Sequence, residues 1–432
     1  MLGQYDILMR VARGIVLAAS ALAPDESSAK FMRFGRGQRR VLSDVAEVCE
    51  GLDRSLPTVW LHCSSLGEYG IARPIISRVK GMMTCNVVVS FFSPTGYEAL
   101  TSRPHVDGDP DAVCYLPLDT AGNAKHFLDT VNPSCAVFMV SEYWHNYLHE
   151  LHNRQIPTIL VSAIIREDGP FFKWYGDIYR SSIKCFDRIF ALDRGSVERL
   201  ESVGAENATV GGDPLFDNAA LVASTPWSNP VVERFVADRK VFMAGSIHRD
   251  QDLEMIARLA NKHTDTPFII VPHEITLTTL CQIEKSVKGE VKRLSQCAED
   301  EDFSSTRALV VDSVGSLAYL YRYATWAYVG GGFSRFLHSI IEPVVYGVPV
   351  AFGPIVTRKV TPRQIDSLGI GKRVEDFDQL DAWFSSIKDN PQALSEIKDK
   401  AKAYVDQNVG ATGRVAQCVV DAVKLKQSGH VE

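Results

Sequence analysis

Short apolar runs alternate with amphipathic helical segments along most of the chain. In the first half such runs lie at 58–62, 86–91, 112–116, 134–139, 157–162 and 187–191, and in the second half at 241–244, 267–271, 308–311, 326–329 and 348–352. Each run is bounded by turn residues and followed by a helical pattern, which is typical of parallel sheets covered by helices. The pattern predicts an α/β fold.

The alternation is broken once, between Gly211 and about Val232, where two proline-containing turns interrupt it. A chain of 432 residues also exceeds what one hydrophobic core usually covers. We therefore predict domains over 41–220 and 221–432. Helical patterns from about 377 to 427 close the chain, and we expect the last helix to return to the first domain.

The first 40 residues differ from both domains. A helix-compatible segment at 5–23 ends at Pro24, and its uninterrupted apolar part, 14–23, is far shorter than the ~20 residues that span a bilayer. A basic cluster follows, interleaved with Phe31, Met32 and Phe34: Lys30, Arg33, Arg36, Arg39 and Arg40. Cationic and apolar side chains together favour the interface of an anionic leaflet, so 1–40 is predicted to associate with a membrane. The alternative is a helix packed on its own domain with a solvated basic turn.

Composition and charge limit the classes of function that the chain could have. The chain is 46% hydrophobic and 23% charged, as ordinary globular proteins are, and its formal charge of −6 argues against general nucleic-acid binding. Nine cysteines lie mostly in apolar runs and form no C-x-x-C pair. This usage indicates buried thiols in a reducing compartment.

The stretch from Gly330 to Pro354 reads as strand, glycine loop, helix and strand. Gly330, Gly331 and Gly332 allow backbone amides to approach a phosphate at the start of the following helix. Ser339 is predicted to cap that helix, and Glu342 in its first turn could accept two ribose hydroxyls. This indicates a nucleotide or nucleotide-sugar site; the alternative is an ordinary βαβ crossover whose glycines only make a tight turn.

Several stretches together resemble one family. They are 61–74, 91–98, 115–133, 141–148, 211–217, 244–248 and 330–354, and they run in the family's order. The chain resembles the Kdo transferases, GT-B glycosyltransferases that attach 3-deoxy-D-manno-octulosonic acid (Kdo) to the lipid A precursor in lipopolysaccharide biosynthesis. The resemblance implies two Rossmann-like domains facing across a cleft. It also implies CMP-Kdo as donor, lipid IVA as acceptor, inversion at the anomeric carbon, and a place on the cytoplasmic face of the inner membrane.

The chain departs from the family pattern on the donor side. Leu337-His338-Ser339 stands where the family commonly has glycine, histidine and asparagine, and Pro272 stands where an arginine often precedes the histidine. Val314 and Ser316 replace a methionine and a glutamate of another element. These departures motivate an alternative within the fold, a UDP-sugar transferase or epimerase. A catalytically silent nucleotide-sugar-binding protein is an alternative of another class.

Glycosyl transfer to a hydroxyl needs a base and stabilisation of the leaving phosphate. Glu68, at a strand's carboxyl end where a helix begins, is predicted to be the general base, as the resemblance also implies; the alternative is an acid that only complements the helix dipole. Glu142, beside Trp144, is the second carboxylate, and two neighbouring acids would raise one pKa. Its alternative role is a structural hydrogen bond to loop amides.

The remaining site predictions follow from the loops at strand ends and from the resemblance. Predicted donor-binding residues are Gly245, Ser246, His273, Gly315, Gly330, Gly331, Gly332, His338, Ser339 and Glu342, and predicted acceptor-binding residues are Ser65, Gly67, Ser93, Thr95 and Arg166. Arg249 and Arg335 are further candidates for anionic partners.

His145, His149 and His152 share one helical face, but the HELH sequence lacks the H-E-x-x-H spacing of zinc hydrolases. We interpret them as a solvated helix face. We expect metal-independent transfer without a cofactor, no nucleic-acid partner, and no protein partner.

Overall fold

The computed structural model describes residues 2–22, 30–106, 108–249, 251–334, 337–356 and 360–428. The chain forms two compact units, Met1–Asp217 with Val409–Glu432, and Asn218–Asn408. The first division falls three residues before the predicted boundary. Each unit is built on a seven-stranded sheet in which every pair of neighbouring strands is parallel.

The sheet of the first unit has the order β3-β2-β1-β4-β5-β6-β7. Its strands are β1 (Thr58–Cys63), β2 (Asn86–Phe91), β3 (Ala112–Tyr115), β4 (Cys135–Met139), β5 (Thr158–Ala163), β6 (Arg188–Ala191) and β7 (Ala208–Val210). Every residue of β1, β2, β4 and β5 is buried, as expected for inner parallel strands covered on both faces.

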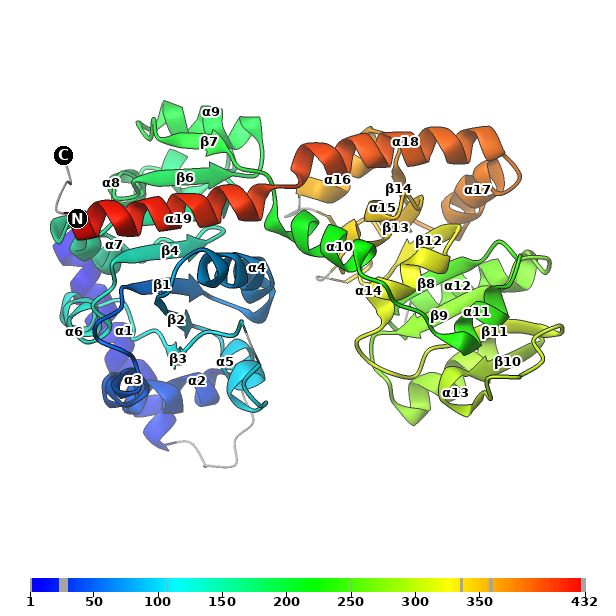
Figure 1. Cartoon of the computed structure of the whole chain (residues 1–432), viewed down its shortest axis with the longest axis horizontal. Coiled ribbons are helices and arrows are strands. Elements are labelled where there is room, and N and C mark those ends of the chain that lie inside the picture. Colours follow the sequence, from blue (N-terminus) through cyan, green and yellow to red (C-terminus); the bar gives the residue numbers. More distant parts are fainter. Residues whose placement is uncertain are drawn as a thin grey trace. The chain divides into compact units, whose positions relative to one another are not determined.

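Helices cover the sheet (Figure 1), and side-chain alternation along the strands separates two cores, one on each face. On one face Trp60 packs with Phe127 and Tyr147, which belong to α6 (Ala121–Val131) and α7 (His145–Asn153). On the other face Val59 and Leu61 pack with α4 (Leu66–Met82) and α19 (Ala411–Ser428). The last helix therefore completes the first unit, as the sequence led us to expect. Shorter helices complete this unit: α3 (Val41–Glu50), α5 (Pro94–Thr101), η1 (Pro170–Phe172), α8 (Asp177–Ile183) and α9 (Arg194–Ser202).

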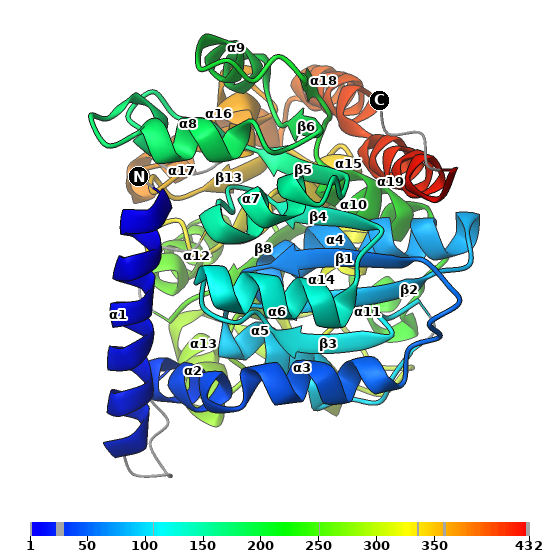
Figure 2. The ribbon, with the colours of Figure 1, turned by 90° about the vertical axis from the view of Figure 1, so that its left-hand side faces the viewer.

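Two helices precede the first sheet, α1 (Leu2–Leu22) and α2 (Lys30–Arg39) (Figure 2). α1 is fixed to the unit by Tyr5, whose hydroxyl donates to Asp119 (2.9 Å), and by Asp6, which accepts from the amide of Ala121 (2.7 Å). Burial also raises the pKa of Asp119, to about 7. Within the described residues, the model contains no helix with the length and apolar character needed to cross a membrane.

The sheet of the second unit has the order β10-β11-β9-β8-β12-β13-β14. Its strands are β8 (Phe242–Ile247), β9 (Phe268–Pro272), β10 (Glu290–Arg293), β11 (Thr306–Val310), β12 (Trp326–Val329), β13 (Val350–Phe352) and β14 (Gly371–Arg373). Its helices are α11 (Pro230–Val236), α12 (Gln251–Lys262), α13 (Leu277–Ser286), η2 (Leu294–Gln296), α14 (Leu317–Leu320), η3 (Tyr321–Tyr323), α15 (Ile341–Val345), α16 (Val360–Ser367), α17 (Phe377–Lys388) and α18 (Pro391–Asn408). α10 (Pro214–Ser224) leads the chain from the first unit into the second.

All eleven predicted strands are present, and three strands were not predicted: β7, β10 and β14. Each of these three is the last strand at one edge of its sheet. An edge strand is covered on fewer sides, so Glu290–Arg293 and Gly371–Arg373 carry charged side chains and show no apolar run.

The helix predicted at His338–Tyr346 is also shorter than expected. It begins only at Ile341, its N-cap is Ile340, and no side chain caps it. The prediction that Ser339 caps this helix was wrong, because the N-cap position is one residue later, at Ile340.

Candidate active site and donor site

Glu68 lies in the first turn of α4, directly after β1. Ser65 is the N-cap of this helix and accepts from the amide of Glu68 (3.4 Å), while the Glu68 carboxylate accepts from the amide of Ser64 (2.6 Å). This pattern resembles a capping box, except that the carboxylate binds the amide of Ser64, one residue before the N-cap, and not the amide of the N-cap itself. It holds the carboxylate over the carboxyl end of the sheet, where ligands of parallel α/β domains bind.

Glu142 follows β4, the neighbour of β1 in the sheet, and sits in a dense polar contact. Its Oε2 accepts from the indole of Trp144 (2.7 Å) and lies 3.6 Å from Nε2 of His62, a distance typical of an ion pair and too long for a hydrogen bond. His62 is fully buried, and its Nδ1 lies 2.9 Å from the hydroxyl of Ser90. Glu142 is thus held by His62 of β1 and by Trp144 of its own loop.

The backbone before Glu142 is strained. Val140 has φ of 62°, a conformation that β-branched residues rarely adopt, and its amide donates to the carbonyl of Val161 (2.7 Å). The strain is maintained by the neighbouring strand β5 and turns the chain so that residue 142 faces the same strand-end region as Glu68.

The pKa values of the two carboxyl groups are displaced in opposite directions. Burial raises the pKa of Glu68 to about 8, and the negative charge of Glu142 adds to this increase. Burial also acts to raise the pKa of Glu142, but His62, Ser64 and Trp144 together hold it below its usual value. Ser64 therefore bridges the pair, since its amide binds Glu68 and its side chain binds Glu142. The predicted rise of one pKa in the pair is confirmed.

The predicted acceptor residues lie in loops beside Glu68. Ser93 donates its amide to the carbonyl of Ser64 (2.9 Å), and its hydroxyl lies 2.8 Å from that of Thr95, so the loops after β1 and β2 are tied together. Gly67 is exposed in the first turn of α4. Arg166 is exposed and makes two hydrogen bonds to Asp168 (2.9 and 2.6 Å). Acceptor binding by these residues stays a prediction.

In the second unit the strand-end loops converge on one buried carboxylate, Asp252 of α12. It accepts from the hydroxyl of Tyr328 (2.7 Å), the amide of Gly331 (2.8 Å) and the amide of His248 (3.2 Å). The amide of Gly330 donates to the carbonyl of Gly245 (2.9 Å). Two amides that the sequence assigned to a phosphate therefore make internal hydrogen bonds.

The glycines of these loops are required by close packing. A Cβ at Gly330 would lie 2.2 Å from the carbonyl oxygen of Ser246, and one at Gly245 would lie 2.1 Å from the hydroxyl of Tyr321. A Cβ at Gly332 would lie 2.5 Å from the amide nitrogen of Gly353. Ser246 itself has φ of 54° at a bulge in β8. Donor binding by Gly245, Ser246 and Gly330–332 stays a prediction.

The other predicted donor residues differ in their surroundings. Burial raises the pKa of Glu342 to about 7, so this carboxyl group is partly protonated at neutral pH. Gly315 has φ of 94° and no atom within 4 Å of a Cβ built on it, which indicates an open turn. Ser339 is exposed. Donor binding by these three also stays a prediction.

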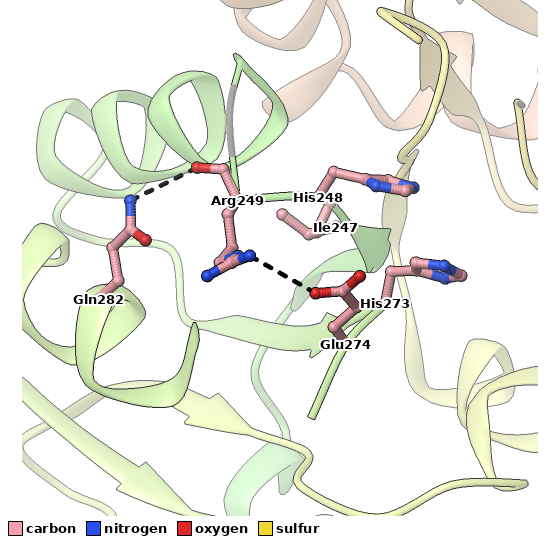
Figure 3. Close-up of a pocket in the computed structure, with 6 residues that line it drawn as sticks. All are labelled: Ile247, His248, Arg249, His273, Glu274 and Gln282. Atoms are coloured by element: carbon pink, nitrogen blue, oxygen red, sulfur yellow. Dashed lines mark hydrogen bonds and ion pairs between the residues drawn. The ribbon is translucent and has the colours of Figure 1, made fainter. Parts of the chain in front are cut away.

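His273 and His338 meet a third histidine, His248. Ring centroids lie 4.5 Å apart for His248 and His273, 4.5 Å for His273 and His338, and 5.3 Å for His248 and His338. A pocket of about 270 Å³ adjoins them and is lined by Ile247, His248, Arg249, His273, Glu274 and Gln282 (Figure 3). Arg249 lies 3.7 Å from Glu274 in this pocket, whereas Arg335 lies outside the described residues.

The interpretation of His145, His149 and His152 as a solvated helix face was wrong for His145. Its ring is buried between Tyr5 and Tyr179 and its Nδ1 lies 2.7 Å from the hydroxyl of Ser182. Burial, helped by the charge of His149, lowers the pKa of His145 to about 4. His145 is a core histidine that joins α1, α7 and α8.

Comparison with known proteins finds similarity to one family. A family model described as 3-deoxy-D-manno-octulosonic-acid transferase (kdotransferase) matches residues 29–218. The 3-deoxy-D-manno-octulosonic acid transferase of Bordetella pertussis is 25% identical over 415 residues, covering 90% of each chain, and that of Aquifex aeolicus is 24% identical over 77% of this chain and 86% of its own. The chain is therefore similar to Kdo transferases over most of its length. It is also 26% identical to a bifunctional glycosyltransferase/methyltransferase of Fusobacterium nucleatum, of whose length it spans only 54%.

Solved structures agree on the fold. The UDP-GlcNAc 2-epimerase of Neisseria meningitidis bound to UDP-GlcNAc is similar with a TM-score of 0.60 and 14% identity, covering 84% of this chain and all of its own. MurG of Acinetobacter baumannii is similar with a TM-score of 0.54 and 13% identity, covering 84% of this chain and 99% of its own. The predicted fold, two Rossmann-like α/β domains of the GT-B type, is confirmed.

Three residues that organise the site were not singled out from the sequence. His62 is a polar residue inside an apolar run, a signal that could have been used, because buried polar side chains need partners. Ser64 lies in a predicted loop. Its contact with both acids, however, depends on the pairing of β1 with β4, because Glu142 follows β4. Asp252 gave no signal, since its partner Gly331 is 79 positions away.

Proposed function

We propose that this chain acts as a member of the Kdo transferase family and transfers Kdo from CMP-Kdo to a hydroxyl of the lipid A precursor lipid IVA, with inversion at the anomeric carbon. Transfer of Kdo in lipopolysaccharide biosynthesis is the activity of the family, and the finer assignment of donor and acceptor is the proposal. The observation that carries it is the carboxyl pair Glu68 and Glu142, whose pKa values are displaced in opposite directions.

In the proposed reaction Glu68 accepts the proton of the acceptor hydroxyl as its oxygen bonds to the anomeric carbon. The bond between that carbon and the phosphate oxygen breaks, and CMP leaves with the electron pair. A base with a pKa of about 8 suits this task, because its ionised form readily takes up a proton near neutral pH. Glu142 stays ionised and orients the acceptor through the loop that it shares with Trp144. Neither step requires a cofactor.

The second unit is proposed to hold the donor. Its strand-end loops present glycines, three imidazoles and the half-buried Glu342, which suits a ligand that combines a phosphate, a carboxylate and a ribose. Arg249 adds a cation in the adjoining pocket. The loops that carry these groups lie at the ends of β8, β9 and β12. These strands are adjacent in the sheet, which supports the proposal of one donor site.

The membrane surface is proposed as the place of reaction, with α1 as the contact. One side of α1 exposes five large apolar side chains, with exposed fractions of 56 to 87%: Ile7, Leu8, Val11, Ile15 and Leu22. These recur at helical spacing and form a continuous apolar stripe, the feature of an interfacial helix. Part of the neighbouring basic charge is already paired, since Arg33 contacts Glu98 (2.6 Å) and Arg40 lies 3.7 Å from Asp44.

Transfer is tested by supplying the purified chain with CMP-Kdo and lipid IVA and measuring the product by mass spectrometry. We expect a mass increase of whole Kdo units, which also counts the units added. Calorimetric titration with CMP and UDP is the parallel measurement. Tighter binding of UDP than of CMP, together with no Kdo product, would instead favour a UDP-sugar enzyme.

Membrane association is tested with vesicles that contain anionic lipid. Replacing Ile7 and Ile15 by serine should lower the vesicle partition coefficient on the order of 100-fold, because each side chain contributes roughly 1.5 kcal/mol when removed from water. Leu425→Ser, at an exposed leucine of α19, is the matched control and should bind as the unaltered chain does. Equal partition of all three proteins would remove α1 from this role.

A further inference from the structure

A line of polar side chains runs through the first sheet to Glu142. His62 of β1 lies between Ser90 of β2 and Glu142, which follows β4. Its Nδ1 is 2.9 Å from the hydroxyl oxygen of Ser90, which also accepts from the indole N–H of Trp60 (2.8 Å), and its Nε2 is 3.6 Å from Oε2 of Glu142. Trp60, His62 and Ser90 are all fully buried. The fold therefore connects the interior of the sheet to one carboxylate of the candidate active site.

The proton on the ring of His62 can be placed from these partners. An indole N–H only donates, so the oxygen of Ser90 accepts from Trp60 and its own hydrogen can be donated to Nδ1 of His62. On the opposite side of the ring, a lone pair on Nε2 would face the oxygen of an ionised carboxylate, which repels it, whereas a proton on Nε2 is attracted. Both sides of the ring therefore favour the neutral tautomer with its proton on Nε2.

This proton is directed at Glu142. Within the described part of the chain, the buried Nε2 atom makes no hydrogen bond of normal length, and its contact with the Glu142 carboxylate is the ion-pair distance of 3.6 Å. A buried N–H without an acceptor costs roughly 1–3 kcal/mol, which attraction to the carboxylate offsets. The ring is also confined, because it packs edge-on against Phe138 and Trp144, with centroid distances of 5.8 and 5.3 Å. Trp144 donates to the same Oε2 atom, so two donors fix the orientation of this carboxylate.

Further ionisable groups act on Glu142 or respond to its charge. Glu68 carries the same sign of charge, and the pKa values of the Cys63 thiol and the Tyr143 hydroxyl are raised by burial and by the charge of Glu142. These three groups are acids, so none of them can stabilise an ionised carboxylate as a cation would. His62 provides the two largest effects that hold the pKa of Glu142 below its usual value. The charge of Glu142 therefore depends chiefly on this one imidazole.

We propose that His62 is a positioning residue for Glu142: Trp60 and Ser90 hold its imidazole in the tautomer with the proton on Nε2, and this N–H keeps the carboxylate of Glu142 ionised and oriented beside Glu68. The consequence for catalysis rests on the proposed function, whereas the tautomer is a property of the chain alone. His62 touches no reacting atom in this scheme, and proton transfer from the acceptor remains with Glu68.

The tautomer is tested by nitrogen NMR of the full chain labelled with ¹⁵N-histidine. In a neutral imidazole, the nitrogen that carries the proton and the nitrogen with the lone pair give well-separated signals, and couplings to the ring protons distinguish Nδ1 from Nε2. The signals of His62 are those that are absent in His62→Gln and shifted in Glu142→Gln. We expect a protonated Nε2 and an unprotonated Nδ1 at pH 7.5. A lone pair on Nε2 would overturn the proposal.

The effect on Glu142 is tested by comparing two substitutions of His62. Glutamine places an amide N–H near the position of Nε2, whereas asparagine places its amide nitrogen near Nδ1 and does not reach Glu142. In the unaltered chain kcat/KM should rise about tenfold per pH unit below pH 8, because only Glu68 titrates there. His62→Asn should steepen this rise toward about 100-fold per pH unit, because Glu142 then titrates in the same range. His62→Gln should restore the shallower profile.

The steepness of the profile separates positioning from a purely structural role, which would lower activity equally at every pH. In a chain that also carries Glu142→Gln, His62→Asn should no longer steepen the profile. His263→Gln is the matched control and should behave as the unaltered chain does, since its ring nitrogen lies 2.8 Å from Asp381 in the second unit. Equal steepness in the asparagine and glutamine variants, with melting temperatures that show both to be folded, would overturn the positioning role. If the unaltered chain transfers no Kdo, the proposed function fails, and the nitrogen spectrum still decides the tautomer.

Discussion

The two units have the same architecture but use the carboxyl edge of their sheets in opposite ways. In the first unit the strand-end loops gather two carboxyl groups, Glu68 and Glu142, and hold them in different protonation states. In the second unit the corresponding loops gather three imidazoles above Asp252, a carboxylate whose acceptor positions are filled by the backbone and Tyr328. An acid in the first unit is therefore available for chemistry, whereas the acid in the second unit supports the loops.

The difference shows that the position of an acid near a strand end does not by itself determine its role. Burial and the nearby negative charge of Glu142 disfavour the ionised form of Glu68, although the amide of Ser64 donates a short hydrogen bond to it (2.6 Å). Asp252 accepts three hydrogen bonds and no carboxylate lies in its network. Substitutions of the two acids should therefore give different kinds of defect.

The largest effect is expected for Glu68→Gln. Glutamine keeps the size of the side chain but cannot accept a proton, so kcat should fall by roughly 10²–10⁴-fold, the usual contribution of a general base. The melting temperature should change little, because the carbonyl oxygen of glutamine can still accept from the amide of Ser64 at the start of α4. Glu201→Gln, at an exposed glutamate of the same unit, is the control. Undiminished Kdo transfer by Glu68→Gln would remove this residue from the role of base.

Asp252→Asn should act on stability first. The amide oxygen can keep the hydrogen bonds from Gly331 and His248, but the NH2 group would then face the hydroxyl of Tyr328, which donates to Asp252, and all three contacts would lose the carboxylate charge. Hydrogen bonds to charged groups contribute about 1.5–3 kcal/mol each, so we expect a loss of about 3 kcal/mol in the free energy of unfolding. Denaturant unfolding measures this, with the exposed Asp399→Asn as control. A stable variant that loses only donor binding would show that Asp252 acts on the ligand.

Glu68 and Asp252 also show how much of the site could be predicted from the sequence. The role of Glu68 was predictable, because the apolar run before it and the small residues around it define a strand end. The support given by Asp252 was not, since it depends on contacts with Tyr328 and Gly331, more than 70 positions away. The same holds for the buried partner His62, whose position opposite Glu142 is created by the pairing of β1 with β4.

Local signals failed where tertiary packing determines the outcome. β10 and β14 were missed because edge strands need no apolar run, and the helix after Gly332 was predicted too long because its first residues pack as an irregular loop. His145 was interpreted as solvated because its helical spacing resembles an exposed face, but α1 covers it through Tyr5.

A smaller effect is expected for Glu142→Gln, and it appears in the pH profile. Burial raises the pKa of Glu68 to about 8 and the charge of Glu142 adds to it, so the base form of Glu68 increases as the pH rises through about 8. Removing the charge of Glu142 should lower the pKa of Glu68, and the rise of kcat/KM should move to lower pH. A profile measured from pH 5.5 to 9.5 tests this, with Glu150→Gln as control. An unchanged midpoint would show that the two acids do not interact.

The smallest effect concerns a feature that the two units share, a residue in the left-handed region where the chain leaves a strand: Val140 in the first unit and Ser246 in the second. At Ser246, φ is 54°, so Ser246→Gly should change the free energy of unfolding by less than about 1 kcal/mol, while Ser246→Val should cost roughly 1–2 kcal/mol because a β-branched residue is disfavoured there. The first unit already tolerates a valine in this conformation, held by the hydrogen bond from Val140 to Val161. If Ser246→Val were as stable as the unaltered chain, the bulge in β8 would be as strongly maintained by its neighbours as the turn before Glu142. Thermal unfolding of the two Ser246 variants distinguishes these cases without reference to activity.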